Sequence, residues 1–83
     1  MYYVYVLKSM KDSNMYIGYT KDLEERLNQH NKGCVNSTKN RRPFELIYYE
    51  TSRNIYDAIH REKYLKTSYG HRYIKNRLKN DTQ

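Results

Sequence analysis

Two short runs of apolar and aromatic residues near the start of the chain limit its folding more than any other feature. Tyr2–Leu7 and Met15–Tyr19 are both rich in aromatic or β-branched residues, and each has the length of a strand. The polar segment between them contains the turn-forming sequence Asp12-Ser13-Asn14. These runs therefore predict an antiparallel hairpin with a rather long loop.

The remainder of the chain predicts one further strand and three helices. The third strand is expected at Phe44–Glu50, after a polar loop at Lys32–Pro43. The expected helices begin near Thr20 or Asp22, after Ser52 or Asn54, and near Gly70, and they end near Gly33, Lys66 and Lys79, with an interruption at Thr67–Gly70. The order β-β-α-β-α-α predicts an α/β (α+β) fold in which helices flank a three-stranded mixed or antiparallel sheet.

The length and charge of the chain limit both its organisation and its partners. With 83 residues we expect one domain, 1–80, and a C-terminal tail, 81–83. Sixteen Lys and Arg against nine acids give a formal net charge of +7, which favours a polyanionic partner such as nucleic acid. We expect no membrane role, because no apolar run is long enough to span a bilayer and the N-terminus lacks a signal-peptide pattern. Cys34 is the only cysteine, which fits a cytoplasmic location.

A glutamate interrupts the apolar face of the second predicted helix. Glu62 lies three residues after Ile59 and three before Leu65, so it shares their face. A carboxylate directed at a core costs several kcal/mol unless a positive group pairs with it. A bound metal ion, a solvent-filled cleft, or an internal salt bridge to Arg26 or another base could offset that cost.

Two further polar residues flank the Leu23 and Leu27 stripe of the first predicted helix. Arg26 and His30 are one helical turn apart and point towards the sheet. Arg26 could bind a phosphate through two hydrogen bonds, and His30 could relay a proton. Equally, Arg26 could pair with a glutamate of its own helix, and His30 could be a satisfied semi-buried residue.

These features occur together in one known pattern. Tyr3-Val4-Tyr5 followed by Tyr16-Ile17-Gly18 resembles the paired motif of the GIY-YIG nuclease superfamily. The segment 21–27 with His30, and then Glu62 on the next long helix, resembles the rest of that pattern. Ser37-Thr38-Lys39 and Arg42-Pro43 are similar to the small single-domain bacterial branch, which is like the N-terminal nuclease domain of the bacterial excision-repair system.

The resemblance implies specific roles for these residues. Tyr5 and Tyr16 would be catalytic tyrosines, Arg26 the phosphate-stabilising base and His30 an accessory catalytic residue. Glu62 would hold one divalent metal ion, Mg²⁺ or Mn²⁺. Gly18 would let the backbone pass close to the site, and Asn76 is a further accessory candidate.

Basic residues outside this pattern are candidates for contacts with phosphates. The polar loop holds Lys32, Lys39, Arg41 and Arg42 and no acid, and the C-terminal part of the chain adds Lys66 and Arg72. We therefore expect a metal-dependent endonuclease that acts on DNA in preference to RNA, with structure-directed or weakly sequence-specific recognition. The alternatives are a nucleic-acid-binding module of the same fold that cuts little, and a basic protein of an RNA particle. The sequence does not indicate the oligomeric state.

Overall fold

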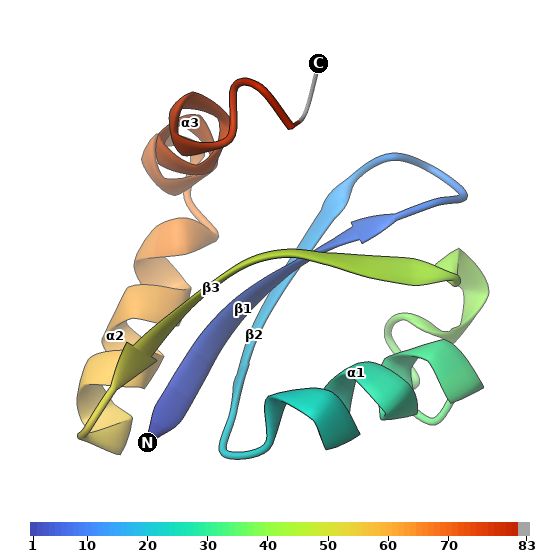
Figure 1. Ribbon diagram of the computed structural model, residues 1–83, viewed down its shortest axis with the longest axis horizontal. Coiled ribbons are helices and arrows are strands. Elements are labelled where there is room, and N and C mark those ends of the chain that lie inside the picture. The colour runs from blue at the N-terminus through green and yellow to red at the C-terminus, as the bar shows by residue number, and fades with distance from the viewer. Residues whose placement is uncertain (82–83) are drawn as a thin grey trace.

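The protein is a three-stranded sheet with helices on both faces (Figure 1). The computed structural model describes residues 1–81; residues 82 and 83 of the predicted tail lie outside this range. The elements are β1 (Tyr2–Ser9), β2 (Met15–Thr20), α1 (Leu23–Lys32), the short 3₁₀ helix η1 (Lys39–Arg41), β3 (Phe44–Ser52), α2 (Ile55–Leu65) and α3 (Ser68–Arg77). The predicted element order and α+β fold class are confirmed, and the sheet is entirely antiparallel.

The first strand lies at the centre of the sheet, in the order β2-β1-β3. It pairs with β2 through the predicted hairpin and with β3 along its whole length, so both of its edges are hydrogen-bonded. The pairing with β3 shifts by one residue between Val6 and Leu7, where Ile47 forms a bulge.

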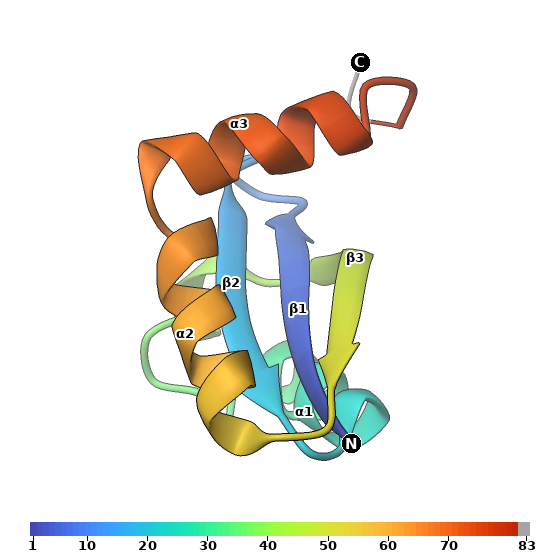
Figure 2. The same cartoon turned by 90° about the vertical axis from the view of Figure 1, so that its left-hand side faces the viewer.

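Side chains of β1 alternate between two cores. Val4 and Val6 are fully buried against Ala58 and Leu65 of α2 and against Ile74 of α3. On the other face, Tyr5 and Leu7 pack with Phe44 and with the leucines of α1. Figure 2 shows this layering, with α2 and α3 in front of the sheet and α1 behind it.

Helix starts follow the predicted caps in two cases and differ in the third. Asp22 caps α1 by accepting a hydrogen bond from the Glu25 N–H, and Asn54 caps α2 in the same way. The predicted start of the last helix near Gly70 is wrong, because α3 already begins at Ser68 with Thr67 as its cap. Gly70 lies inside α3 and packs on the end of α2; a Cβ there would be 2.3 Å from Leu65 Cα.

The loop between α1 and β3 is fixed against the β1–β2 turn. Arg41 forms an ion pair with Asp12 at 2.7 Å and also donates to the Asn14 carbonyl. Ser9 Oγ donates to the Arg41 carbonyl. The loop is therefore held in place, together with the residues it carries, by contacts that span nearly 30 positions in sequence. None of the described helices is long and apolar enough to cross a membrane.

Candidate active site

Two tyrosines and a histidine form an aromatic cluster on the α1 side of the sheet. Tyr5 comes from β1, Tyr16 from β2 and His30 from α1. The His30 ring makes edge contacts with both tyrosines, at centroid distances of 5.7 Å to Tyr5 and 5.0 Å to Tyr16. Tyr5 is almost fully buried, with 2% of its surface exposed, whereas Tyr16 is half-buried. The predicted catalytic tyrosines and His30 are thus neighbours.

Glycine at position 18 makes room for Tyr5. The two residues are partners across β1 and β2, and the Tyr5 ring lies over the backbone of β2. A Cβ at Gly18 would be only 2.5 Å from the Tyr5 hydroxyl oxygen, well inside contact distance. Any larger residue would displace the hydroxyl, so Gly18 serves side-chain placement as well as the path of the backbone.

A buried hydrogen-bond chain fixes the histidine. His30 Nε2 lies 2.9 Å from Tyr5 Oη, and Nδ1 lies 2.8 Å from Thr38 Oγ1. Both His30 and Thr38 are fully buried. Burial, with a smaller contribution from the Arg26 charge, lowers the pKa of His30 from 6.5 to about 4. The imidazole is therefore neutral at physiological pH and can accept a hydrogen bond.

Arg26 lies beside the tyrosine hydroxyl. Its guanidinium is half-buried, and Nη1 donates to Gln29 Oε1 at 2.9 Å. Within residues 1–81 no carboxylate forms an ion pair with Arg26, so an ion pair with a glutamate of its own helix is not observed. Burial raises the pKa of Tyr5 above its usual value of 10.0, and a hydrogen bond from Arg26 opposes that rise. Arg26 is thus a cation near the catalytic candidate with capacity to bind a further anion.

Glu62 approaches the same region from the other side of the sheet. Only 14% of its side chain is exposed, and its one ion-pair partner among the described residues is Lys66, with Nζ 3.5 Å from Oε1. The Glu62 charge contributes to the raised pKa of Tyr5, so the carboxylate is close enough to influence the hydroxyl. The glutamate that interrupts the apolar face of α2 is therefore largely covered, and its contact with the exposed Lys66 is long.

The remaining predicted site residues lie on the surface. Asn76 is exposed on α3. Five of the predicted phosphate-binding bases are also exposed, namely Lys32, Lys39, Arg42, Lys66 and Arg72. Arg41 differs, because it is half-buried and its guanidinium is bound to Asp12 and to backbone carbonyls.

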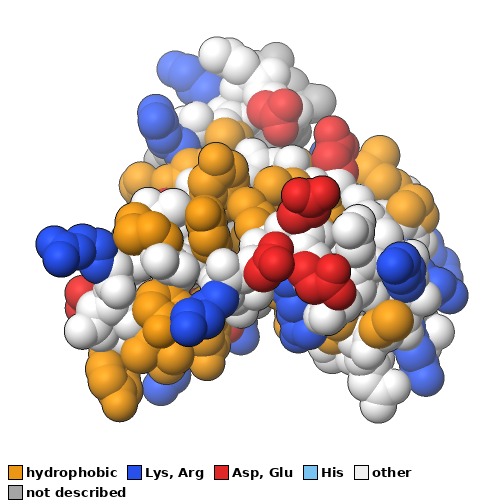
Figure 3. All heavy atoms as spheres, turned by 60° about the horizontal axis from the view of Figure 1, so that its bottom comes forward, with side chains coloured by type: hydrophobic (Ala, Val, Ile, Leu, Met, Phe, Trp, Pro, Cys, Tyr) orange, Lys and Arg blue, Asp and Glu red, His pale blue; other side chains and the backbone are white. Residues whose placement is uncertain are grey.

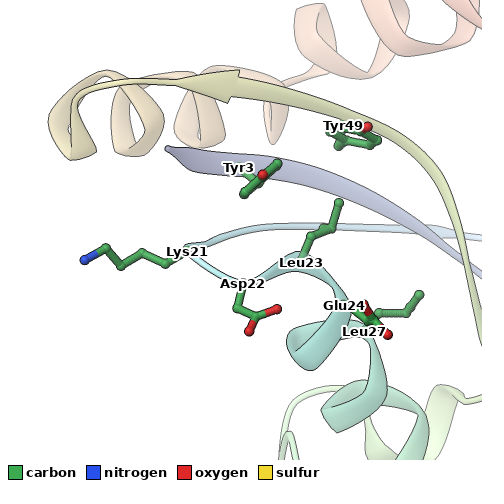
Figure 4. Close-up of a pocket in the computed structure, with 7 residues that line it drawn as sticks. All are labelled: Tyr3, Lys21, Asp22, Leu23, Glu24, Leu27 and Tyr49. Carbon is green, nitrogen blue, oxygen red and sulfur yellow. The ribbon is translucent and has the colours of Figure 1, made fainter.

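A pocket on the surface lies apart from the candidate site residues. Figure 3 brings the lower side of Figure 1 forward and shows acidic side chains near the middle of this face, with Lys and Arg side chains both beside them and around the margin. The pocket, of about 490 Å³, is lined by Tyr3, Tyr49 and residues of and just before α1, among which Lys21 is basic and Asp22 and Glu24 are acidic. Figure 4 shows these side chains. Neither of the predicted catalytic tyrosines lines this pocket, nor does Glu62. None of the predicted site residues lines it, so we do not assign it to the site.

Sequence reasoning missed two parts of the polar interior. Thr38 contacts His30 from a loop without periodicity, so no pattern marked it as a site residue. Glu50 and Arg61 form a two-bond ion pair, and the Tyr48 hydroxyl donates to Glu50. This second network joins β3 to α2 on the face opposite α1, and we regard it as structural.

Known proteins resemble this chain over most of its length. Residues 1–79 match the family of the GIY-YIG catalytic domain. A UPF0213 protein of Clostridium perfringens is 45% identical over 67 residues, which cover 80% of this chain and 71% of that protein. UPF0213 proteins of Staphylococcus saprophyticus and Bacillus pumilus are 42% and 43% identical, each over 80% of this chain and over 80% and 67% of their own lengths. No solved structure matches the chain.

Proposed function

The chain belongs to the GIY-YIG family, a nuclease family, and we propose that it is a metal-dependent endonuclease that hydrolyses phosphodiester bonds in DNA. One observation carries this proposal. Tyr5, His30 and Arg26 meet on one side of β2, and the largely covered Glu62 reaches the same region from the other side. A protein that only binds nucleic acid has no need for a carboxylate and a tyrosine hydroxyl that are both largely buried in the same region.

Tyr5 and His30 would act as one proton relay. Phosphodiester hydrolysis needs a water molecule that loses a proton as its oxygen attacks phosphorus. In the relay the water proton bonds to Tyr5 Oη while the hydroxyl's own proton passes to His30 Nε2. The tyrosine stays neutral throughout, and the imidazole becomes positively charged. It then gives the extra proton back to Tyr5 Oη, whose own proton passes to solvent.

The other two residues of the α1 side would contact the substrate. Arg26 would bind a non-bridging phosphate oxygen and stabilise the charge that develops there in the transition state. Tyr16 lies outside the buried hydrogen-bond chain and is half-buried, so its hydroxyl is available to contact the scissile phosphate or the water.

Glu62 has the chemistry of a ligand for a hard divalent cation. Mg²⁺ prefers oxygen ligands, retains several waters and is often bound by only one or two carboxylates. A single largely covered carboxylate with one long lysine contact fits that preference. Among residues 1–81, no group of three His, Cys, Asp or Glu could form a richer metal site. When bound there, Mg²⁺ or Mn²⁺ would polarise the phosphate and stabilise the leaving oxygen.

The surface charge supports nucleic acid as the partner. Five predicted phosphate-binding bases are exposed and would contact phosphates without reading sequence: Lys32, Lys39, Arg42, Lys66 and Arg72. We therefore propose structure-directed or weakly specific cleavage, in the cytoplasm, with branched or damaged DNA as the substrate class to test. Affinity should fall steeply as salt concentration rises.

The test is cleavage of supercoiled plasmid and of a branched DNA junction with Mg²⁺, Mn²⁺ or EDTA. We expect cleavage that requires metal and falls by about 100-fold or more in Glu62→Gln and in Arg26→Ala. Matched controls are Glu45→Gln and Arg53→Ala, which remove the same charges at exposed positions and should cut like wild type.

Two results would overturn the proposal. If Glu62→Gln and Arg26→Ala each cut as fast as wild type, the assigned site is wrong. If wild type binds the junction in a salt-dependent way and leaves it intact with either metal, the protein is a binding module.

A further inference from the structure

Thr38 is buried at the far end of the hydrogen-bond chain from Tyr5. It lies in the loop between α1 and β3, just before η1, and none of its surface is exposed. Its backbone is already satisfied, since its N–H donates to the Val35 carbonyl and its own carbonyl accepts from the Arg41 N–H. The hydroxyl is therefore available to the His30 ring, 2.8 Å from Nδ1.

The donors and acceptors around the two rings fix which way the hydrogen bonds run. The buried Tyr5 O–H requires an acceptor, and Arg26 beside it offers only donors. His30 Nε2, 2.9 Å away, is the acceptor that remains. A neutral imidazole that accepts at Nε2 carries its hydrogen on Nδ1, so the ring donates to Thr38 Oγ1. The Thr38 hydroxyl in turn has the Val35 carbonyl within reach, at 3.4 Å.

We propose that Thr38 is a positioning residue that holds His30 in the Nδ1–H tautomer, so that the Tyr5 hydroxyl donates inward and turns its lone pairs to the attacking water. Thr38 touches no reacting atom and acts through His30. This role rests on the proposed function, because it concerns the relay described there.

Removing the Thr38 hydroxyl should reverse the direction of the hydrogen bond between Tyr5 and His30. In Thr38→Val a methyl group replaces Oγ1, and Nδ1–H would be buried without a partner, which is unfavourable. The ring can avoid that cost by moving its hydrogen to Nε2. Nε2–H then donates to Tyr5 Oη, and the hydroxyl can no longer pass its proton to the ring. Thr38→Ser keeps the hydroxyl and serves as the matched control.

The tautomer can be read directly by ¹⁵N NMR of the histidine rings in folded protein, with the His30 signals assigned by their loss in His30→Gln. We expect Nδ1–H in wild type and Thr38→Ser, and Nε2–H or a mixture in Thr38→Val. In the cleavage assay Thr38→Val should lower kcat by about 10-fold or more with KM within about two-fold, and Thr38→Ser should restore most of kcat.

The NMR result separates this inference from the proposed function. If wild type carries Nε2–H, or if Thr38→Val keeps Nδ1–H, the inference is wrong, whether or not the protein cuts DNA. If wild type carries Nδ1–H and cuts no DNA, the tautomer assignment stands and the nuclease proposal fails. If Thr38→Val does not fold, the wild-type tautomer and the kcat of Thr38→Ser still decide, because a serine variant as slow as His30→Gln would refute the role of the hydroxyl.

Discussion

Acid should weaken this fold through one buried histidine. The pKa of His30 is about 4 in the folded protein because the ring is buried, whereas a histidine in the unfolded chain keeps a value of 6.5. The folded value is the lower one, so the unfolded state binds more protons as pH falls, and stability is lost from about pH 6.5 down to about pH 4. Protonation thus favours unfolding.

The size of the effect follows from the two pKa values. Between pH 7 and pH 5 the unfolded histidine becomes almost fully protonated while the folded one stays mostly neutral, which removes about 2 kcal/mol from the free energy of unfolding. A domain of this size loses about 1 kcal/mol of stability per molar urea, so the urea midpoint should fall by about 2 M. Asp12, whose pKa is lowered to about 2 by its hydrogen bond from Arg41, affects stability only at lower pH.

Urea unfolding followed by circular dichroism at pH 7, 6 and 5 measures this effect. The control is His30→Gln, which lacks the titrating ring; its starting stability will be lower, but its midpoint should change little between pH 7 and pH 5. Equal losses in wild type and in His30→Gln would refute the assignment, because the acid sensitivity would then arise from another group.

Two glycines give further predictions. Gly18→Ala should lower cleavage by about 10-fold or more while the protein stays folded, because its Cβ would displace the Tyr5 hydroxyl; cleavage and circular dichroism on one sample test this. Gly70→Ala should instead lower the free energy of unfolding by about 1–3 kcal/mol, because its Cβ would meet the α2 backbone at Leu65 and Tyr64, which cannot rotate away. Urea unfolding measures the loss, and an unchanged midpoint would contradict the close packing of α2 and α3.

Local patterns were enough to predict most of the fold. The apolar runs at Tyr2–Leu7 and Met15–Tyr19 and the predicted caps Asp22 and Asn54 each correspond to an observed element. The position of Gly70 was misread, since a glycine within a polar stretch usually ends a helix. Here the missing side chain is needed for close approach of α3 to α2, which is a tertiary requirement that propensity does not express.

The candidate site was predictable where its residues sit on periodic elements and unpredictable where they sit on the loop. Glu62 broke the apolar stripe of a helix, and Arg26 and His30 flanked another, so periodicity exposed all three. Thr38 and Arg41 lie in a polar segment without periodicity, so nothing in the sequence indicated which residues they would contact. Their partners, His30 and Asp12, lie 8 and 29 residues away, and only the folded loop reveals those contacts.

The electrostatics around Tyr5 decide how a tyrosine could serve as the base. Burial and the negative charge of Glu62 raise the pKa of Tyr5, and the hydrogen bond and charge of Arg26 only partly offset them. With a pKa above 10, fewer than about 1% of the hydroxyls are ionised at pH 7.5, so a preformed phenolate is a poor candidate for the base. A hydroxyl that donates to a neutral imidazole avoids this difficulty, because it can take a proton from water while giving up its own. The His30 Nε2, which is unprotonated at physiological pH and 2.9 Å from Tyr5 Oη, is the acceptor that makes that exchange available.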